Sequence, residues 1–399
     1  METHKIEREH GAGQRAAGQR ILPGATVGVL GGGQLGRMLA LTGIPMGYRF
    51  IALEPAEDSP MAQAAGRQIT AAYDDLAAAR RLAEEADVIT YEFENVDAGV
   101  AALLAEEAYV PQGHELLFTT QHRLREKRAI EAAGIPVAPY AAVQSEAELA
   151  EAVARIGVPC VLKTATGGYD GKGQVVIRVA EEAEAAYAAL GAGAVQLVLE
   201  RFIRFTHELS VIAARSASGE VRAFPAAENI HVDNILHVSI APARLPADLC
   251  REAEELAVRL AEALGVVGLL AVELFLTEDG QLYVNELAPR PHNSGHYTIE
   301  ACYTSQFEQH LRAICDLPLG LPDLHTPAVM VNLLGQHVEP AFAWLAGQEA
   351  EEPGLSVKLH LYGKKEAKPN RKMGHITLLG DDTERSLAWI KRSGIWPDR

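Results

Sequence analysis

The sequence predicts an α/β protein with additional antiparallel sheet (α+β), built from more than one domain. Three observations carry this prediction. The 399 residues are enough for two to four domains of ordinary size. Short apolar runs alternate with helical patterns over the first hundred residues, as in a parallel sheet covered by helices. Further along, a glycine-rich loop lies between two β-rich runs, and a long acidic hairpin follows.

Composition excludes several classes of function. The chain has 36 basic and 53 acidic residues, and its net charge of -17 disfavours binding to nucleic acid. The four cysteines form no CxxC pair, which disfavours a disulfide scaffold or a cysteine zinc site. The longest strongly apolar stretch, residues 266–276, is too short for a membrane span. With no export signal in view, we expect a cytoplasmic protein whose residues 1–20 form a disordered tail.

The first predicted domain covers residues 21–118. Its expected strands are residues 25–30, 50–53 and 87–91, and its expected helices are residues 34–42 and 75–86. Residues 31–36, GGGQLG, match GxGxxG between a strand and a helix, with Glu54 ending the next strand. A helix N-terminus of this kind suits a dinucleotide, a phosphorylated substrate, or simply a tight turn.

The second predicted domain covers residues 119–320. We expect helices over residues 120–133, 145–156 and 246–264; Thr120 caps the first, and Ser145 with Glu148 forms a capping box on the second. Expected strands are residues 160–163, 174–179, 195–199, 208–213 and 221–226. The loop between the first two has four glycines in the seven positions from 167 to 173, so it can fold over a polyphosphate with Lys172 as counter-charge. Lys163 is either a second phosphate-binding ammonium or an ordinary surface lysine.

A hairpin with an Asp279-Gly280 turn is predicted to carry the metal site. A two-residue loop there pairs Glu273 with Glu286 across the strands. Two facing carboxylates repel unless a cation neutralises them, and hard oxygen ligands favour Mg²⁺ or Mn²⁺. A solvated pair at a sheet edge is the alternative.

Two polar segments follow this hairpin. Residues 289–296, PRPHNSGH, form a rigid loop rich in hydrogen-bond donors, suited to an anionic or hydroxylated substrate. Residues 364–372 contain five basic side chains and are either a solvated loop or a phosphate-binding patch. They belong to a small third domain, residues 321–399, with expected strands 328–334, 356–362 and 374–379 and a helix over residues 382–393.

Taken together, these motifs resemble the ATP-grasp superfamily. VLGGGQLGRM, YEFENV, GGYDGKGQ, NELAPRPHNSGHYT and KEAKPNRKMGH occur in the order found in N5-carboxyaminoimidazole ribonucleotide synthetases, and the resemblance spans residues 21 to about 395. It implies an N-terminal Rossmann-like domain, a central ATP-grasp domain with a mobile lid at about 143–203, and a small β-rich C-terminal domain. The implied reaction, in purine biosynthesis, joins bicarbonate to 5-aminoimidazole ribonucleotide through carboxyphosphate, with MgATP giving ADP and phosphate. A homodimer is also implied.

The resemblance also assigns roles to individual residues. It places ATP on Arg123, Lys163, Gly168, Tyr169, Asp170, Gly171, Lys172, Gly173, Gln174, Glu200, Arg201, Phe202, Ile203, Glu208, His231, Asn285 and Glu286. The metal is expected on Glu273 and Glu286. The aminoimidazole ribonucleotide and bicarbonate are expected on Tyr169, Asp170, Arg290, His292, Asn293, Lys365 and Arg371, with Asp170 orienting or deprotonating the amine. Lys364, beside Lys365, is an alternative for the inward-facing ammonium.

Three other functions compete with this interpretation. A formate-dependent glycinamide ribonucleotide transformylase shares a PRPH stretch, although the segments from Asn293 and from Lys365 favour the carboxylating enzyme. The GxGxxG run and Glu54 suit an NAD-dependent dehydrogenase, which leaves the paired carboxylates unexplained. A regulator that binds ATP without turnover is the third alternative.

Overall fold

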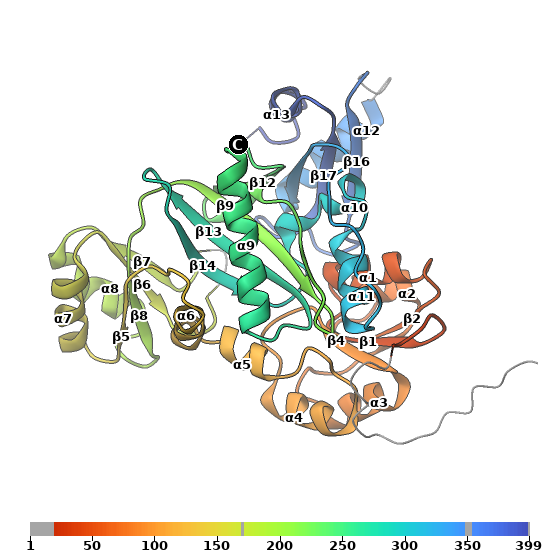
Figure 1. Cartoon of the computed structure of the whole chain (residues 1–399), viewed down its shortest axis with the longest axis horizontal. Coiled ribbons are helices and arrows are strands. Elements are labelled where there is room, and N and C mark those ends of the chain that lie inside the picture. The colour runs from red at the N-terminus through yellow and green to blue at the C-terminus, as the bar shows by residue number, and fades with distance from the viewer. Residues whose placement is uncertain (1–19, 169–170, 348–352, 398–399) are drawn as a thin grey trace, which may run out of the picture.

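The computed structural model describes residues 20–168, 171–347 and 353–397. The predicted tail, apart from Arg20, lies outside this part of the chain, as do Tyr169 and Asp170. The described strands form three sheets, one parallel and two antiparallel (Figure 1). The mixed architecture that the sequence predicts is therefore confirmed.

The parallel sheet is built by the N-terminal hundred residues. Its elements are β1 (Thr26–Leu30), α1 (Gln34–Gly43), β2 (Arg49–Leu53), α2 (Pro60–Ala65), β3 (Gln68–Ile69), α3 (Leu76–Glu85), β4 (Val88–Tyr91) and α4 (Ala98–Glu107). The strand order is β3-β2-β1-β4, and every pairing is parallel. All residues of β1 are buried, as expected for a strand covered on both faces. Asp75 and Asp97 begin α3 and α4 by accepting backbone N–H groups.

A second unit forms the separate lobe seen at the left of Figure 1. It contains β5 (Tyr140–Val143), α7 (Glu146–Ile156), β6 (Cys160–Thr164), β7 (Gln174–Ile177), a 3-10 turn (Ala180–Glu182), α8 (Ala183–Ala189) and β8 (Leu197–Arg201). Helix α6 (Arg123–Ala132) precedes the lobe and packs on the central part of the chain. The strands form an antiparallel sheet in the order β5-β8-β6-β7. Ser145 caps α7 through the Glu148 N–H, whereas the Glu148 carboxylate accepts from Gln144 N, so the predicted capping box is only half formed.

The helix predicted over residues 120–133 is wrong at its start. A short helix, α5 (Glu115–Thr120), ends at Thr120, and α6 begins only at Arg123. The Thr120 hydroxyl donates to Leu116 O within α5 and caps nothing. A threonine side chain forms either bond, so residue type alone does not distinguish a helix end from a helix beginning.

The central sheet has nine strands and runs into the C-terminal part of the chain. Its elements are β9 (Phe205–Arg215), β10 (Val221–Ala223), β11 (Ala227–Val232), β12 (Ile235–Ala241), α9 (Ala247–Ala263), β13 (Gly268–Thr277), β14 (Leu282–Ala288), α10 (Thr298–Ala301), α11 (Gln306–Ile314), β15 (Ala328–Leu334), α12 (Val338–Gly347), β16 (Ser356–Leu361), β17 (Lys372–Leu379) and α13 (Thr383–Arg392), with 3-10 turns at Asn293–Gly295 and Gly335–His337. The order is β14-β13-β9-β11-β12-β15-β17-β16, with β10 beside β9. The C-terminal strands therefore continue the central sheet.

Helix α9 shows why this sheet is stable. Its buried side chains recur at intervals of three and four residues and form one apolar stripe. That stripe packs on β9, β10 and β13, so the helix covers one face of the sheet (Figure 1).

The sequence analysis did not predict β5, β11 or β12, and the strand predicted over residues 221–226 is shorter, because β10 ends at Ala223. Within the described residues, no helix combines the length and apolarity needed to cross a membrane.

Candidate active site

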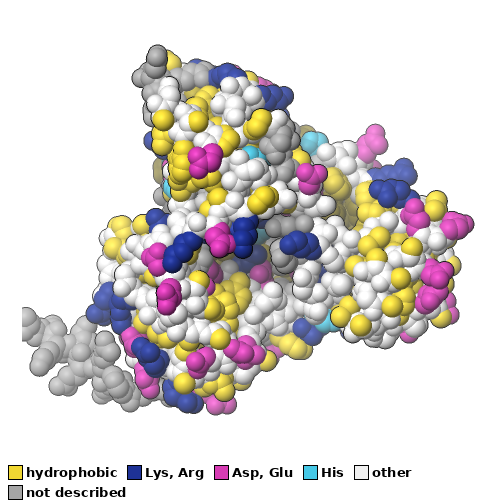
Figure 2. Space-filling model, turned by 180° about the vertical axis from the view of Figure 1, so that it is seen from behind, with side chains coloured by type: hydrophobic (Ala, Val, Ile, Leu, Met, Phe, Trp, Pro, Cys, Tyr) yellow, Lys and Arg dark blue, Asp and Glu magenta, His cyan; other side chains and the backbone are white. Residues whose placement is uncertain are grey.

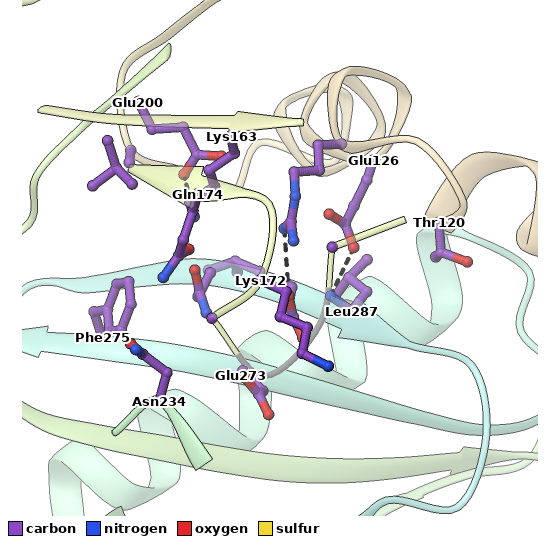
Figure 3. A pocket seen from close by; sticks show the side chains of 18 of the residues that line it. Thr120, Glu126, Lys163, Lys172, Gln174, Glu200, Asn234, Glu273, Phe275 and Leu287 are labelled. Atoms are coloured by element: carbon purple, nitrogen blue, oxygen red, sulfur yellow. Dashed lines mark hydrogen bonds and ion pairs between the residues drawn. The ribbon is translucent and has the colours of Figure 1, made fainter. Parts of the chain in front are cut away.

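A cavity of about 630 Å³ lies between the lobe and the central sheet. Seen from behind, the molecule is hollowed where these two parts meet (Figure 2). Close by, Lys163 and Glu200 come from the strands of the lobe, whereas Glu273 and Phe275 come from β13 on the opposite side (Figure 3). A space of this size can hold a nucleotide between the two sheets.

The hairpin of β13 and β14 brings two carboxylates together by a route that differs from the prediction. Its turn is a three-residue loop in which Gly280 N donates to Thr277 O and Gly280 has φ +79, rather than the predicted two-residue loop. This shifts the register by one residue near the turn. A bulge at Asn285 shifts it back, so Glu273 still pairs directly with Glu286.

Both carboxylates belong to the wall of the cavity. Burial, followed by the charge of Glu286, raises the pKa of Glu273. Arg123 Nη1 lies 3.4 Å from Glu286 Oε2, and His292 Nε2 lies 3.3 Å from Glu273 Oε1. Two facing acidic groups of this kind fit a divalent cation with hard oxygen ligands. In the described part of the chain, no three His, Cys, Asp or Glu side chains cluster as a metal site.

A buried ion cluster lies across the cavity. Glu200 Oε2 is 3.1 Å from Lys163 Nζ and 3.2 Å from Lys127 Nζ, and all three residues are buried. Burial raises the pKa of Glu200, but the two ammonium charges outweigh it and lower this pKa to about 2. The pKa of Lys163 is also lowered, because for this lysine the cost of burial exceeds the attraction of one shared carboxylate. Lys163 is thus an oriented cation, which excludes the surface-lysine alternative.

Glu126 lies on α6 beside the carboxylate pair. Its Oε1 accepts a hydrogen bond of 2.8 Å from Leu287 N, the residue after Glu286 (Figure 3). Burial, together with the charge of Glu286, raises the pKa of Glu126 to about 8. This hydrogen bond joins α6 to the hairpin of β13 and β14.

The remaining nucleotide-side residues surround the same space. Glu208 Oε2 lies 2.8 Å from His231 Nδ1. Burial lowers the pKa of His231, but the hydrogen bond and charge of Glu208 outweigh it, so the pKa of this imidazole lies above its usual value. Phe205 and Phe275 stack with ring centroids 4.6 Å apart and supply an aromatic wall.

The glycine-rich loop requires glycine at positions that closely approach a neighbouring side chain or the loop's own backbone. At Gly171, φ is +76, and a Cβ there would lie 2.6 Å from the Cβ of Asn234 in the β11–β12 turn. At Gly168, a Cβ would lie 2.9 Å from Lys172 O. The loop therefore lies against the opposite sheet at the mouth of the cavity.

The loop after β14 lines the other end of the cavity. Arg290 Nε lies 2.7 Å from Glu94 Oε1. Burial, aided by the charge of Arg290, lowers the pKa of His292 well below its usual value, so this imidazole is neutral. Asn293 exchanges two amide hydrogen bonds, of 3.0 and 2.7 Å, with Asn332 of β15.

The N-terminal glycine run is not an open anion site. The N–H groups of Gly33 and Gly36 donate to the buried carboxylate of Glu92, and Gly32 N donates to Glu54 at 2.8 Å. The positive end of α1 is therefore neutralised by the protein itself. The backbone donors of Gly32, Gly33 and Gly36 are thus taken by carboxylates of the protein, which favours the tight-turn alternative.

The basic segment of residues 364–372 divides into inward and outward side chains. Lys365 is 63% exposed, with its Nζ 3.9 Å from Asp58 Oδ2, and Arg371 is exposed and donates to Glu366 O. Lys364 instead donates to Lys372 O at 2.7 Å, and burial lowers its pKa to about 8. Lys364 is therefore the more buried of the two neighbours, and neither of them lines the cavity.

Most of the predicted site residues meet at the cavity. Its lining includes Arg123, Lys163, Gly168, Gly171, Lys172, Gln174, Glu200, Arg201, Phe202, Ile203, Glu208, His231, Glu273, Asn285, Glu286, Arg290, His292 and Asn293. Of the described residues that were predicted, Gly173, Lys365 and Arg371 do not line it. Sequence reasoning missed other lining residues, among them Glu94, Glu126, Phe205, Asn234, Phe275 and Lys372. Glu94 lies within YEFENV and Lys372 within KEAKPNRKMGH, so these two motifs held the available signal.

Family models match the chain in three consecutive stretches. A ribonucleotide synthetase preATP-grasp domain matches residues 24–121, and an ATP-grasp domain matches residues 128–307. A phosphoribosylaminoimidazole carboxylase C-terminal domain matches residues 328–388.

Individual relatives share this arrangement over their full length. The chain is 51% identical over 383 residues to the N5-carboxyaminoimidazole ribonucleotide synthase of Bacillus subtilis, with 94% of this chain and 98% of the relative covered. This chain belongs to the N5-carboxyaminoimidazole ribonucleotide synthase family. Members of the family are ATP-dependent ligases of the ATP-grasp type, as the sequence analysis expected.

Solved structures of this synthase family agree with the fold. An N5-carboxyaminoimidazole ribonucleotide synthetase in complex with ADP matches with a TM-score of 0.89 at 53% identity, covering 95% of this chain and 98% of that one. The synthase of Aspergillus clavatus, in complex with ADP and 5-aminoimidazole ribonucleotide, matches with a TM-score of 0.85 at 34% identity and covers 92% and 97% of the two chains.

Proposed function

We propose that this chain carboxylates 5-aminoimidazole ribonucleotide with bicarbonate, at the expense of MgATP, to give N5-carboxyaminoimidazole ribonucleotide, ADP and phosphate in purine biosynthesis. One observation carries the proposal beyond the family name. A single cavity has Glu273 and Glu286 on one wall and Lys163 with the glycine-rich loop on the other. This pairing of acidic and basic walls suits a metal-bound triphosphate.

ATP fits between the two sheets. Lys163 and Lys172 supply positive charge for the phosphates, and backbone amides of the glycine-rich loop add donors. The strand end Glu200 to Ile203 presents backbone groups for the edge of the base, next to the Phe205–Phe275 wall. Glu208 and His231 are positioned to accept and donate hydrogen bonds at the ribose.

Mg²⁺, or Mn²⁺ in its place, fits the carboxylate pair. Glu273 and Glu286 would hold the ion, which would supply positive charge beside the phosphates. Burial and then the negative charge of Glu286 raise the pKa of Glu273. A divalent cation held by the two carboxylates would offset the repulsion between them.

The chain's own groups perform the rest of the chemistry. Bicarbonate becomes a strong electrophile once its oxygen takes the γ-phosphoryl group and carboxyphosphate forms, and cations stabilise the charge spread over the oxygens. Carboxyphosphate, or carbon dioxide released from it, must meet the amine before water does, which a lid at about 143–203 would ensure. Arg290, His292 and Asn293 line the end of the cavity suited to these substrates. We propose that Lys364, in place of Lys365, supplies the ammonium group of residues 364–372 to the ribonucleotide and bicarbonate. Tyr169, Asp170 and Arg371 remain proposed contacts of the same two substrates.

We further propose domain limits of 21–118, 119–320 and 321–399, a cytoplasmic location and a homodimer. Sedimentation of the purified chain at micromolar concentration tests the dimer, since a monomer throughout would refute it.

A phosphate-release assay tests the reaction. Release that requires MgATP, bicarbonate and 5-aminoimidazole ribonucleotide together supports the proposal. Release that requires glycinamide ribonucleotide and formate instead would assign the chain to the transformylase reaction. ATP binding without turnover under any of these conditions would support the regulator alternative.

A further inference from the structure

Ser294 is a buried residue of the loop after β14 that does not line the cavity. Its side chain is 1% exposed, whereas its neighbours His292 and Asn293 both belong to the lining. Ser294 is the middle residue of the 3-10 turn Asn293–Gly295. Any effect of its hydroxyl on the site therefore passes through a neighbouring side chain.

The main chain of His292 is held by the side-chain amide of Gln306, which is fully buried at the start of α11. Gln306 Oε1 accepts from His292 N at 2.9 Å, and Gln306 Nε2 donates to His292 O at 2.8 Å. The turn also packs tightly on β9, because a Cβ at Gly295 would collide with the side chain of Ile212. The backbone of the loop is thus fixed relative to the central sheet, and with it the origin of the imidazole.

The hydrogen bonds at Nδ1 determine the tautomer of His292. Ser294 N donates to this nitrogen at 3.4 Å, and because a backbone N–H can only donate, Nδ1 is an acceptor and carries no hydrogen. Ser294 Oγ lies 2.9 Å from the same nitrogen. Ser210 Oγ donates to Ser294 Oγ at 2.8 Å, which leaves the hydrogen of the Ser294 hydroxyl for Nδ1. The single hydrogen of the imidazole ring nitrogens is therefore on Nε2.

The Nε2 atom of His292 lies next to the carboxylate pair, 3.3 Å from Glu273 Oε1. A ring nitrogen that carries hydrogen attracts a carboxylate oxygen, whereas a bare ring nitrogen repels it. Hydrogen bonds at catalytic sites are often long before substrate binds and shorten in the complex. Ser210 is the direct cross-strand partner of Glu273 in the pairing of β9 with β13, so the polar chain begins and ends at the same place on the sheet.

We propose that Ser294 is a positioning residue that holds His292 as the Nε2–H tautomer and thereby orients the Glu273 carboxylate for the divalent cation. The part of this assignment that concerns the cation rests on the proposed function. His292 donates to Glu273 Oε1, and the other oxygen of Glu273 is left for the ion, beside Glu286. Groups that orient a metal ligand in this way change the affinity for the metal although they do not touch it.

Nitrogen-15 NMR of histidine-labelled protein, without metal or nucleotide, tests the tautomer. The signals of His292, assigned by their loss in His292→Gln, should show an unprotonated Nδ1 and a protonated Nε2. Ser294→Ala should move the Nδ1 resonance downfield, because the hydroxyl donor is lost. Ser386→Ala removes another buried serine hydroxyl, on α13, and is the matched control that should leave it in place. A hydrogen on Nδ1 in the wild type would overturn the assignment, and so would an unmoved resonance in Ser294→Ala.

Binding of Mn²⁺ tests the positioning role. The affinity of Mn²⁺ for the complex with ADP, measured by electron paramagnetic resonance, should fall about two- to tenfold in Ser294→Ala, the size of one lost neutral hydrogen bond. The affinity for ADP without metal should be unchanged, which shows that the variant is folded. Unchanged Mn²⁺ affinity would overturn the positioning role. Absence of bicarbonate-dependent turnover in the wild type would refute the proposed function, whereas the tautomer and the effect on Mn²⁺ binding are measured without that reaction.

Discussion

Replacing Glu200 with Gln tests the buried ion cluster behind the nucleotide site. The substitution keeps the shape of the side chain but leaves Lys127 and Lys163 buried beside each other without a counter-charge. The fall in the pKa of Glu200 from 4.5 to about 2 corresponds to roughly 3 kcal/mol of stabilisation by the folded state. Breaking a buried pair from one side costs about 3 to 5 kcal/mol, so the two lines of reasoning agree in size.

The measurement is the thermal midpoint of the ligand-free variants at pH 7. Because the chain has several units that can unfold separately, midpoints are compared without extracting a single free energy. Glu107→Gln is the control, because Glu107 and Arg80 form a pair at 2.8 Å on the surface, where water screens the charges. Glu200→Gln should lower the midpoint by several degrees, Glu107→Gln should leave it unchanged, and Lys127→Met should restore part of the loss when added to Glu200→Gln. Equal midpoints for Glu200→Gln and Glu107→Gln would refute the reasoning.

The sign of the pH dependence follows from the direction of the shift. The pKa of Glu200 is lowered by folding, so its contribution is complete above the unfolded value of 4.5 and is lost as the pH falls towards about 2. The difference in midpoint between wild type and Glu200→Gln should therefore shrink as the pH is lowered from 5 towards 3. A difference that grows over this range would contradict the assignment of charge.

Three further predictions follow from the site. Glu286→Gln should fold but lower MgATP turnover at least about 100-fold in the phosphate-release assay, because one of the two proposed metal ligands is lost. The control Asp279→Asn, at the exposed tip of the same hairpin, should match the wild type. Glu208→Gln should lower the pKa of His231, followed by NMR of its imidazole, because the charge of Glu208 that opposes burial is then lost and only the charge of Glu273 still opposes it. An unchanged titration would contradict the pairing. Glu92→Ala should destabilise the N-terminal unit by about 1 to 3 kcal/mol, because it leaves the Gly33 and Gly36 N–H groups unpaired. Hydrogen exchange of β1 and α1 measures this loss, and full protection of α1 in the variant would contradict the prediction.

The sequence predicted those parts of the fold whose signals are local. Alternating apolar runs identified β1, β2 and β4, and a periodic apolar stripe identified α9, because burial on a strand or helix face leaves a fixed spacing. The strands β11 and β12 were missed although they pair with each other in a hairpin. Their other partners are β9 for β11 and β15 for β12, and β15 lies far away in sequence. The glycine cluster at residues 31–36 indicated that another group approaches the backbone there, but it did not identify that group. The group is the carboxylate of Glu92, which follows β4, the strand that pairs with β1.

The carboxylate pair shows how a correct prediction can rest on an incomplete mechanism. A two-residue turn would give the pairing of Glu273 with Glu286 directly, and the protein reaches the same pairing with a longer turn and a compensating bulge. The hydrophobic pattern explains why the compensation is required. Leu274 and Val284 are buried near the turn and Val272 and Leu287 are buried beyond it, so a single uncorrected shift would turn one of these sets away from the core.

The same bulge explains why this hairpin is suited to a metal. A regular strand alternates its side chains between the two faces, so consecutive residues cannot both face one cavity. At the bulge, Asn285 and Glu286 are consecutive and both line the cavity. Glu126 fixes the next peptide group by accepting from Leu287 N, at a position where the strand has left regular geometry. The extra residue in β14 thus places two adjacent polar residues, Asn285 and Glu286, on the lining of the cavity, and the buried carboxyl of Glu126 on α6 fixes the peptide group that follows them.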